Sequence, residues 1–158
     1  MFRIGIGWDT HRLAEGRPLI LGGVRITADR GAEGHSDGDV LAHAFADAIL
    51  GALGEGDLGL HFPDNDPQWK DADSLELLAR VIRSAHERGF RVVNADSTIT
   101  LERPKLRDQI AAMRENLART LDVDTGCVSV KAKTGEGLDA VGRGEAVTAQ
   151  AIVLLQES

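Results

Sequence analysis

The stretch "MFRIGIGWDTHRL", residues 1–13, opens with apolar side chains at every second position and then becomes polar. The period of two predicts a β-strand over residues 1–8. Its apolar positions are Phe2, Ile4, Ile6 and Trp8. Asp9 and His11 follow, where this strand is predicted to end. Because an i, i+2 spacing in extended chain places both side chains on the same side, these two residues could share a ligand.

The rest of the chain alternates between strand and helix patterns. Strands are predicted over residues 17–26, 91–101, 127–133 and 145–156, and helices over residues 39–53, 73–89 and 103–121. In the helix over 73–89, Asp73 and Glu76 form a capping box and Gly89 provides the stop. This order, with hairpins at both ends, predicts the α+β class: a two-layer α/β sandwich with a mixed sheet.

Composition narrows the classes of protein. A chain of 158 residues without repeats or linkers predicts a single domain over residues 1–158. The formal net charge of −7 argues against nucleic acid and anionic membrane surfaces as partners. No apolar run approaches the roughly 20 residues that span a bilayer. The single cysteine, Cys127, and the lack of an export leader predict a cytoplasmic protein.

A third candidate ligand lies in the helix predicted over residues 39–53. At roughly 100° per residue, His43 points about 170° away from the centre of the apolar stripe. That stripe consists of Val40, Leu41, Ala44, Phe45, Ala48, Ile49, Ala52 and Leu53. Two histidines and a carboxylate form a donor set that catalytic zinc sites use. Spacing alone leaves open the alternative that Asp9 caps a turn and both histidines, His11 and His43, are solvated.

Two polar segments flank this helix. In "GHSDGDV", residues 34–40, Asp39 is a good N-cap, and His35 and Ser36 could donate hydrogen bonds to an anion near the helix N-terminus. The stretch "GDLGLHFPDNDPQWKDAD", residues 56–73, is dense in Asp, Pro and Gly. It is either a flexible lid over a site or an ordinary solvated loop.

The segment "KAKTGEGLDAVGRGE", residues 131–145, contains neither a Walker loop nor a dinucleotide fingerprint. A glycine-rich hairpin connection explains its composition. The backbone amides beside Lys133 and Thr134 could nevertheless hold a phosphate, with a divalent cation at Glu136.

The motifs "GWDTH", "HSDGDVLAHA", "GDLGLHFPD", "RPKL" and "GRGE", in this order, resemble those of the 2-C-methyl-D-erythritol 2,4-cyclodiphosphate synthase family of the non-mevalonate isoprenoid pathway. The resemblance implies a homotrimer with active sites between subunits, and a reaction that closes a diphosphate ring and releases CMP from a cytidine diphosphate substrate. Two alternatives remain: a zinc-dependent phosphohydrolase, and a trimeric metal-containing binding module without turnover.

The resemblance also implies roles for individual residues. Zinc ligands would be Asp9, His11 and His43, a magnesium or manganese ion would lie at Glu136, and His35 and Thr134 would be catalytic. Substrate contacts would come from Asp9, His11, His35, Ser36, Asp57, Leu58 and Gly59; from the lid residues Phe62, Pro63, Asp64, Asn65 and Asp66; from the cytidine pocket of Pro104, Lys105, Leu106, Ala132, Lys133, Thr134 and Gly135; and from Arg143. The chain departs from the family's pattern at Lys133, Gly135, Gly137, Asp139 and Ala140.

Arg143 and Glu145 follow a glycine turn into the last predicted strand. With Ile6 and Trp8 they could line a central channel of the implied trimer, where a phosphate-bearing isoprenoid would bind. Solvent-facing charges and ordinary core residues are the alternative.

Overall fold

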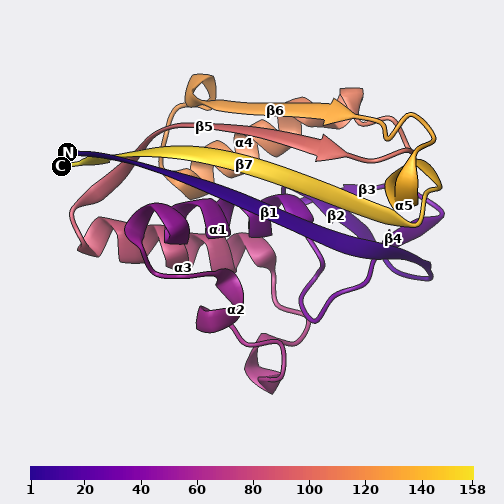
Figure 1. Cartoon of the computed structure of the whole chain (residues 1–158), viewed down its shortest axis with the longest axis horizontal. Coiled ribbons are helices and arrows are strands. Elements are labelled where there is room, and N and C mark those ends of the chain that lie inside the picture. Colours follow the sequence, from indigo (N-terminus) through magenta and orange to yellow (C-terminus); the bar gives the residue numbers. More distant parts are fainter.

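In the computed structural model, which describes all 158 residues, a five-stranded sheet has the order β4-β1-β7-β5-β6 (Figure 1). A separate hairpin joins β2 and β3. The strands are β1 (Phe2–Glu15), β2 (Leu19–Leu21), β3 (Val24–Ile26), β4 (Arg30–Ala32), β5 (Phe90–Thr100), β6 (Val128–Lys133) and β7 (Ala146–Glu157). The α-helices are α1 (Val40–Leu53), α2 (Leu58–His61), α3 (Ser74–Glu87), α4 (Ile110–Leu121) and α5 (Asp139–Gly142). Short 3-10 turns span Pro67–Trp69, Arg107–Gln109 and Thr125–Cys127.

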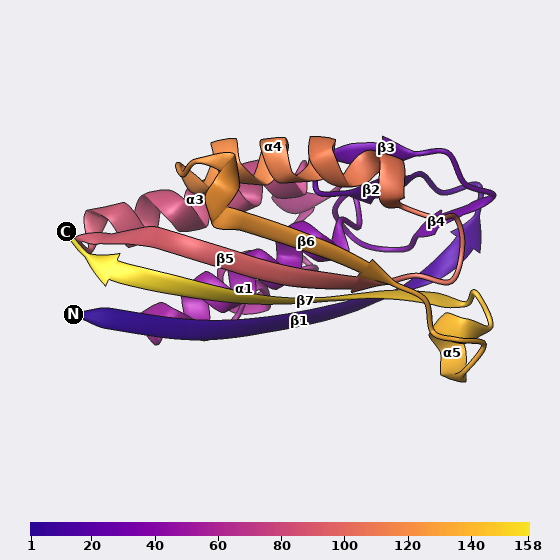
Figure 2. The same cartoon turned by 90° about the horizontal axis from the view of Figure 1, so that it is seen from above.

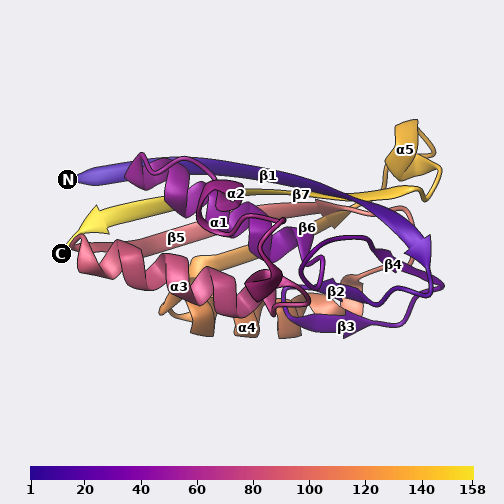
Figure 3. The ribbon, with the colours of Figure 1, turned by 90° about the horizontal axis from the view of Figure 1, so that it is seen from below.

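The long helices α1, α3 and α4 cover one face of the sheet, and the other face is bare (Figure 2). Seen from below, these helices run along the length of the strands (Figure 3). Strands β5 and β6 are parallel, whereas β1, β5 and β4 pair antiparallel with their other neighbours. The predicted α+β sandwich with a mixed sheet is therefore confirmed. None of the helices combines the length and hydropathy that a membrane crossing requires.

Three predicted boundaries were wrong. Strand β1 continues to Glu15, because its backbone pairs with β7 as far as Arg12 and with β4 from Leu13 to Glu15. Asp9 and His11 therefore lie within a strand. The single strand predicted over 17–26 is a hairpin, turned at two glycines with positive φ, Gly22 and Gly23. The helix predicted from residue 103 begins only at Ile110, and a loop and a 3-10 turn precede it.

The apolar alternation of β1 faces outward. The side chains of Phe2, Ile4, Ile6 and Trp8 are between 54% and 71% exposed on the bare face of the sheet. Facing the helices instead are Gly5 and Gly7, where α1 comes so close that there is no room for a side chain. A Cβ atom on Gly5 would lie 1.8 Å from the carbonyl oxygen of Ala48, and one on Gly7 would lie 1.9 Å from that of Ala44.

Helix α1 is buried on nearly all sides between the sheet and α3. Asp39 caps it as predicted, accepting from the backbone N–H groups of Leu41 and Ala42 at 3.1 Å. The same carboxylate, which is 0% exposed, also accepts from Gly22 N at 2.9 Å and Gly23 N at 2.7 Å. One side chain therefore fastens the β2–β3 hairpin to the start of α1.

Two glycine substitutions test the close approach of α1 to β1. We expect Gly7→Ala to destabilise the protein by about 3 kcal/mol or more, because the added methyl group would meet backbone that cannot move alone. Gly51→Ala is the matched control, since its Cβ would lie 3.8 Å from the nearest atom, Ile6 O. That change should stabilise α1 by about 0.5–1 kcal/mol. Urea unfolding at fixed protein concentration measures both, and equal midpoints would contradict the assigned contact.

Candidate metal centre and substrate cavity

Three potential metal ligands converge between β1 and α1. His43 Nδ1 lies 2.9 Å from Asp9 Oδ2 and 3.2 Å from His11 Nε2, and His11 Nε2 lies 3.0 Å from Asp9 Oδ2. All three donor atoms fall within 4.8 Å of one another. The predicted same-side placement of Asp9 and His11 is confirmed, since both side chains belong to the inner face of β1 and their ligand atoms meet there. Two imidazoles and one carboxylate at this spacing suit a divalent transition metal.

Other contacts turn the two imidazole rings toward this common point. His11 Nδ1 lies 2.6 Å from the carbonyl oxygen of Glu33, so Nδ1–H donates there and Nε2 faces Asp9. His43 Nε2 lies 2.8 Å from Ser74 Oγ, which leaves Nδ1 facing Asp9. His43 lies outside the apolar core, as predicted, yet it is only 9% exposed because polar side chains surround it.

Opposite charges shift the pKa values of this group. Burial alone would raise the pKa of Asp9, but hydrogen bonds from His11 and His43, together with their charge, hold it well below its ordinary value. Burial alone would lower the pKa of His11, but the hydrogen bond and negative charge of Asp9 raise it above the usual 6.5. Asp9 is therefore ready to bind a cation at any physiological pH, whereas a protonated His11 would have to lose its proton before it could bind one.

A cavity of about 480 Å³ opens beside the three ligands, and the residues predicted for the phosphate and lid contacts surround it. His35, Ser36, Leu58, Gly59, Phe62, Pro63, Asp64 and Asn65 all line it, together with His11 and His43. Asp57 lines a smaller adjoining hollow of about 260 Å³, which also borders Asp9. Asp66 contributes its carbonyl oxygen, which lies 3.0 Å from His35 Nε2.

The segment predicted as a lid or a loop is packed against the body of the protein. The rings of Phe62 and Trp69 meet edge to face with centroids 5.0 Å apart. The Arg80 guanidinium, from α3, lies 5.3 Å from the centroid of the Trp69 ring. These contacts, with the His35–Asp66 bond, hold the segment over the cavity.

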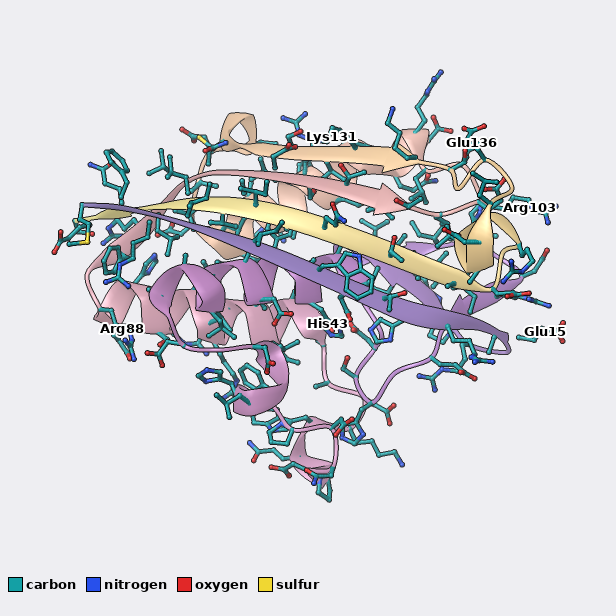
Figure 4. The ribbon with its side chains drawn as sticks, in the orientation of Figure 1. Glu15, His43, Arg88, Arg103, Lys131 and Glu136 are labelled. Carbon is teal, nitrogen blue, oxygen red and sulfur yellow. The ribbon has the colours of Figure 1, made fainter.

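The residues predicted for the cytidine pocket, with Glu136, make up the nucleotide half of the predicted site. They gather away from the three candidate metal ligands, which belong to the metal half. Pro104, Lys105, Leu106, Ala132, Lys133 and Thr134 line a separate cavity of about 620 Å³. Thr134 Oγ1 donates to Glu136 Oε1 at 2.7 Å, and Gly135 N donates to Glu102 Oε2 at 2.9 Å. Figure 4 shows Glu136 beyond the end of β6, while His43 lies below β1. The two predicted halves of the site therefore do not meet within one chain.

Arg143 joins neither half. It forms an ion pair with Glu145 through two N···O contacts of 3.1 Å. It also lines a cavity of about 610 Å³ with Arg30 and Arg103. Its predicted contact with substrate, and with an isoprenoid phosphate, stays a prediction.

Sequence reasoning missed three polar residues at the metal group. Asp47 borders the smaller hollow and accepts from Leu58 N at 2.7 Å; its position one turn after His43 on the same helix was an available signal. Ser74 lies at the start of one predicted helix and Asp37 in the polar segment before another, and no local pattern reveals their contact with each other. They lie 37 residues apart in the sequence.

Together, the fold and the site define a small α+β protein with a candidate Asp/His/His metal site beside a cavity of about 480 Å³. The chain belongs to the YgbB family, whose model matches residues 2–156. It is 58% identical to the 2-C-methyl-D-erythritol 2,4-cyclodiphosphate synthase of Geobacillus kaustophilus, over all of both chains, and 57% identical to that of Salinibacter ruber, over 99% of both.

Solved structures agree with these relatives. A 2C-methyl-D-erythritol-2,4-cyclodiphosphate synthase in its CDP-bound form superposes with a TM-score of 0.90 at 44% identity, over 98% of this chain and all of that one. The bifunctional IspDF from Campylobacter jejuni gives a TM-score of 0.96 at 44% identity, over all of this chain and 43% of that protein.

The pH dependence of metal binding follows from the raised pKa of His11. A protonated imidazole cannot bind a metal, so acidification through that pKa should weaken binding by about tenfold per pH unit for each proton displaced. The folding stability of the metal-free protein changes with pH in the opposite direction. The His11–Asp9 pair stabilises the fold at low pH, and this stabilisation is lost as the pH rises through the pKa of His11. Metal titration and thermal unfolding from about pH 5 to about pH 8, the range in which histidines titrate, measure both effects. An affinity that is flat over this range would contradict the ligand assignment.

Proposed function

We propose that this protein converts 4-diphosphocytidyl-2-C-methyl-D-erythritol 2-phosphate into 2-C-methyl-D-erythritol 2,4-cyclodiphosphate and releases CMP. The observation that carries the proposal is the convergence of Asp9, His11 and His43 beside the 480 Å³ cavity, in a chain that matches synthases over its full length. The predicted cytoplasmic location stays a prediction.

The ligand set suits zinc, because it offers three protein donors and would leave a fourth position for a substrate oxygen. Zinc held there supplies Lewis-acid polarisation of the substrate's β-phosphate. Glu136 would hold the second ion, magnesium or manganese. One carboxylate is enough for it, because such ions usually complete their coordination with substrate phosphates and water. Glu136 Oε1 accepts from Thr134, which fixes the carboxylate on its exposed loop.

Charge repulsion is the main obstacle to the reaction. An oxygen of the 2-phosphate bonds to the β-phosphorus while the bond from that phosphorus to CMP breaks, and both reacting groups are anionic. His35 and Ser36 border the metal-side cavity and are placed to donate hydrogen bonds to phosphate oxygens. Thr134 and Lys133 can do the same on the nucleotide side. No general base is required, because the attacking phosphate is already ionised.

Orientation of the substrate supplies much of the remaining rate enhancement. Fixing both ends of one flexible substrate in line can contribute about 7–11 kcal/mol. The cavity lined by Lys105 and Leu106 would hold the cytidine end, and the metal group would hold the phosphate end. The packed segment of Phe62 and Trp69 would keep water away from the reacting phosphates.

A homotrimer would bring the two halves together. The bare face of the sheet presents Ile4, Ile6 and Trp8 from β1, with Ile152 of β7 opposite Ile6. An apolar surface this continuous is typical of an interface between subunits. In a cyclic trimer the contacts are head-to-tail, so the metal half of one chain can face the nucleotide half of its neighbour.

Product analysis tests the reaction. We expect zinc- and magnesium-loaded protein to convert the cytidylated substrate into the cyclic diphosphate and CMP in equal amounts. The His43→Ala variant should lose nearly all activity and most bound zinc, because it lacks one of three ligands, while His86→Ala on α3 should keep both. Phosphorus NMR identifies the product. Acyclic phosphates would indicate a hydrolase instead, and no product would indicate a binding module without turnover.

Complementation tests the shared site. His43→Ala disables the metal half and Thr134→Ala the nucleotide half, so neither variant alone should be active. After unfolding and refolding in equal amounts, random assembly leaves an unmutated pair of halves at about one site in four, and about a quarter of wild-type activity should return. If each site belonged to a single chain, a trimeric and half zinc-loaded mixture would remain inactive.

A further inference from the structure

The outer nitrogen of His43 contacts a buried serine. His43 Nε2, the nitrogen that faces away from Asp9 and His11, lies 2.8 Å from Ser74 Oγ. Ser74 is the first residue of α3 and only 1% exposed. Its hydroxyl in turn donates to the carboxylate of Asp37. A continuous chain of hydrogen bonds therefore runs from the metal group to a carboxylate.

The direction of this chain follows from the number of protons. A serine hydroxyl has one proton, and Ser74 gives it to Asp37. Its lone pairs remain to accept, so His43 Nε2 must carry the hydrogen. When a metal is bound, Nδ1 is then the nitrogen whose lone pair would bind it, on the side where Nδ1 faces Asp9 Oδ2 at 2.9 Å.

Asp37 is itself held firmly. Its carboxylate also accepts from the backbone N–H of Ser74 and from that of Asp39, each at 3.1 Å. Its own N–H donates to the carbonyl oxygen of Ala72 at 3.1 Å. Ser36 Oγ completes the cluster, 3.1 Å from His43 Nε2 and 3.3 Å from Ser74 Oγ. The loop before α1 and the start of α3 are thus joined behind the histidine.

We propose that Ser74 and Asp37 are positioning residues of the metal centre. The Asp37 carboxylate orients the Ser74 hydroxyl, and that hydroxyl selects the His43 tautomer and fixes the plane of its ring. Hydrogen-bonded partners behind a metal-binding histidine commonly raise metal affinity in this way. The inference rests on the metal centre of the proposed function, and it concerns residues that touch neither the metal nor the substrate cavity.

Metal affinity and histidine NMR test this proposal. Removing the hydroxyl in Ser74→Ala should weaken zinc binding by about 10–100-fold, measured by competition with a chelator. Ser84→Ala, at a half-buried serine on the same helix, is the matched control and should change affinity less than about twofold. Asp37→Asn should weaken binding less than Ser74→Ala, because the serine hydroxyl remains. Ser74→Thr, which keeps the hydroxyl, should recover most of the affinity.

The tautomer and its proton exchange give a second measurement that does not depend on zinc affinity. In ¹⁵N spectra of the zinc-loaded wild-type protein, His43 should carry its proton on Nε2, and in folded, zinc-loaded Ser74→Ala this proton should exchange faster with water. Nδ1 protonation in the zinc-loaded wild-type protein would overturn the inference, as would unchanged zinc affinity in folded Ser74→Ala. A wild-type protein that binds no zinc would instead overturn the metal centre and, with it, the positioning role.

Discussion

The close packing of α1 on β1 is the constraint on which the remaining structure depends. Gly5 and Gly7 present no side chain to the helix, so the backbone carbonyls of Ala44 and Ala48 lie almost against the strand. His43 precedes Ala44 directly, and the inner face of β1 continues from Gly7 to Asp9. The contact that seats the helix therefore also sets the distance between the candidate metal ligands, and loosening it would separate them.

The same packing determines the outer surface. Because the glycines point inward, the alternating large residues of β1, such as Ile6 and Trp8, point away from the core and leave an apolar face uncovered. A monomer gains nothing from that arrangement, whereas an assembly of several chains can bury it. The separation of the metal half from the loop of Thr134 and Glu136 is a second feature that the proposed trimer would explain.

Buried polar groups then hold the site in one arrangement. Asp39 accepts four backbone N–H bonds, which tie the β2–β3 hairpin to α1. Asp37 ties the adjoining loop to α3 through Ser74. Such groups are costly to bury unless they are fully paired, so each favours the single packing that satisfies it. His35 and Ser36 directly precede these two anchors in the loop before α1.

The sequence by itself determined the helices and strands with strong periodicity, the Asp39 cap, and the same-side placement of Asp9 and His11, because these depend on neighbours within a few residues. The approach of His43 to that pair depends on the packing of α1 on β1. Tertiary structure decided the rest. The length of β1 depends on its pairing with β7, and the outward turn of its apolar side chains depends on the approach of α1. The contact between Asp37 and Ser74 joins residues distant in sequence, and only the folded chain brings such groups within hydrogen-bonding distance.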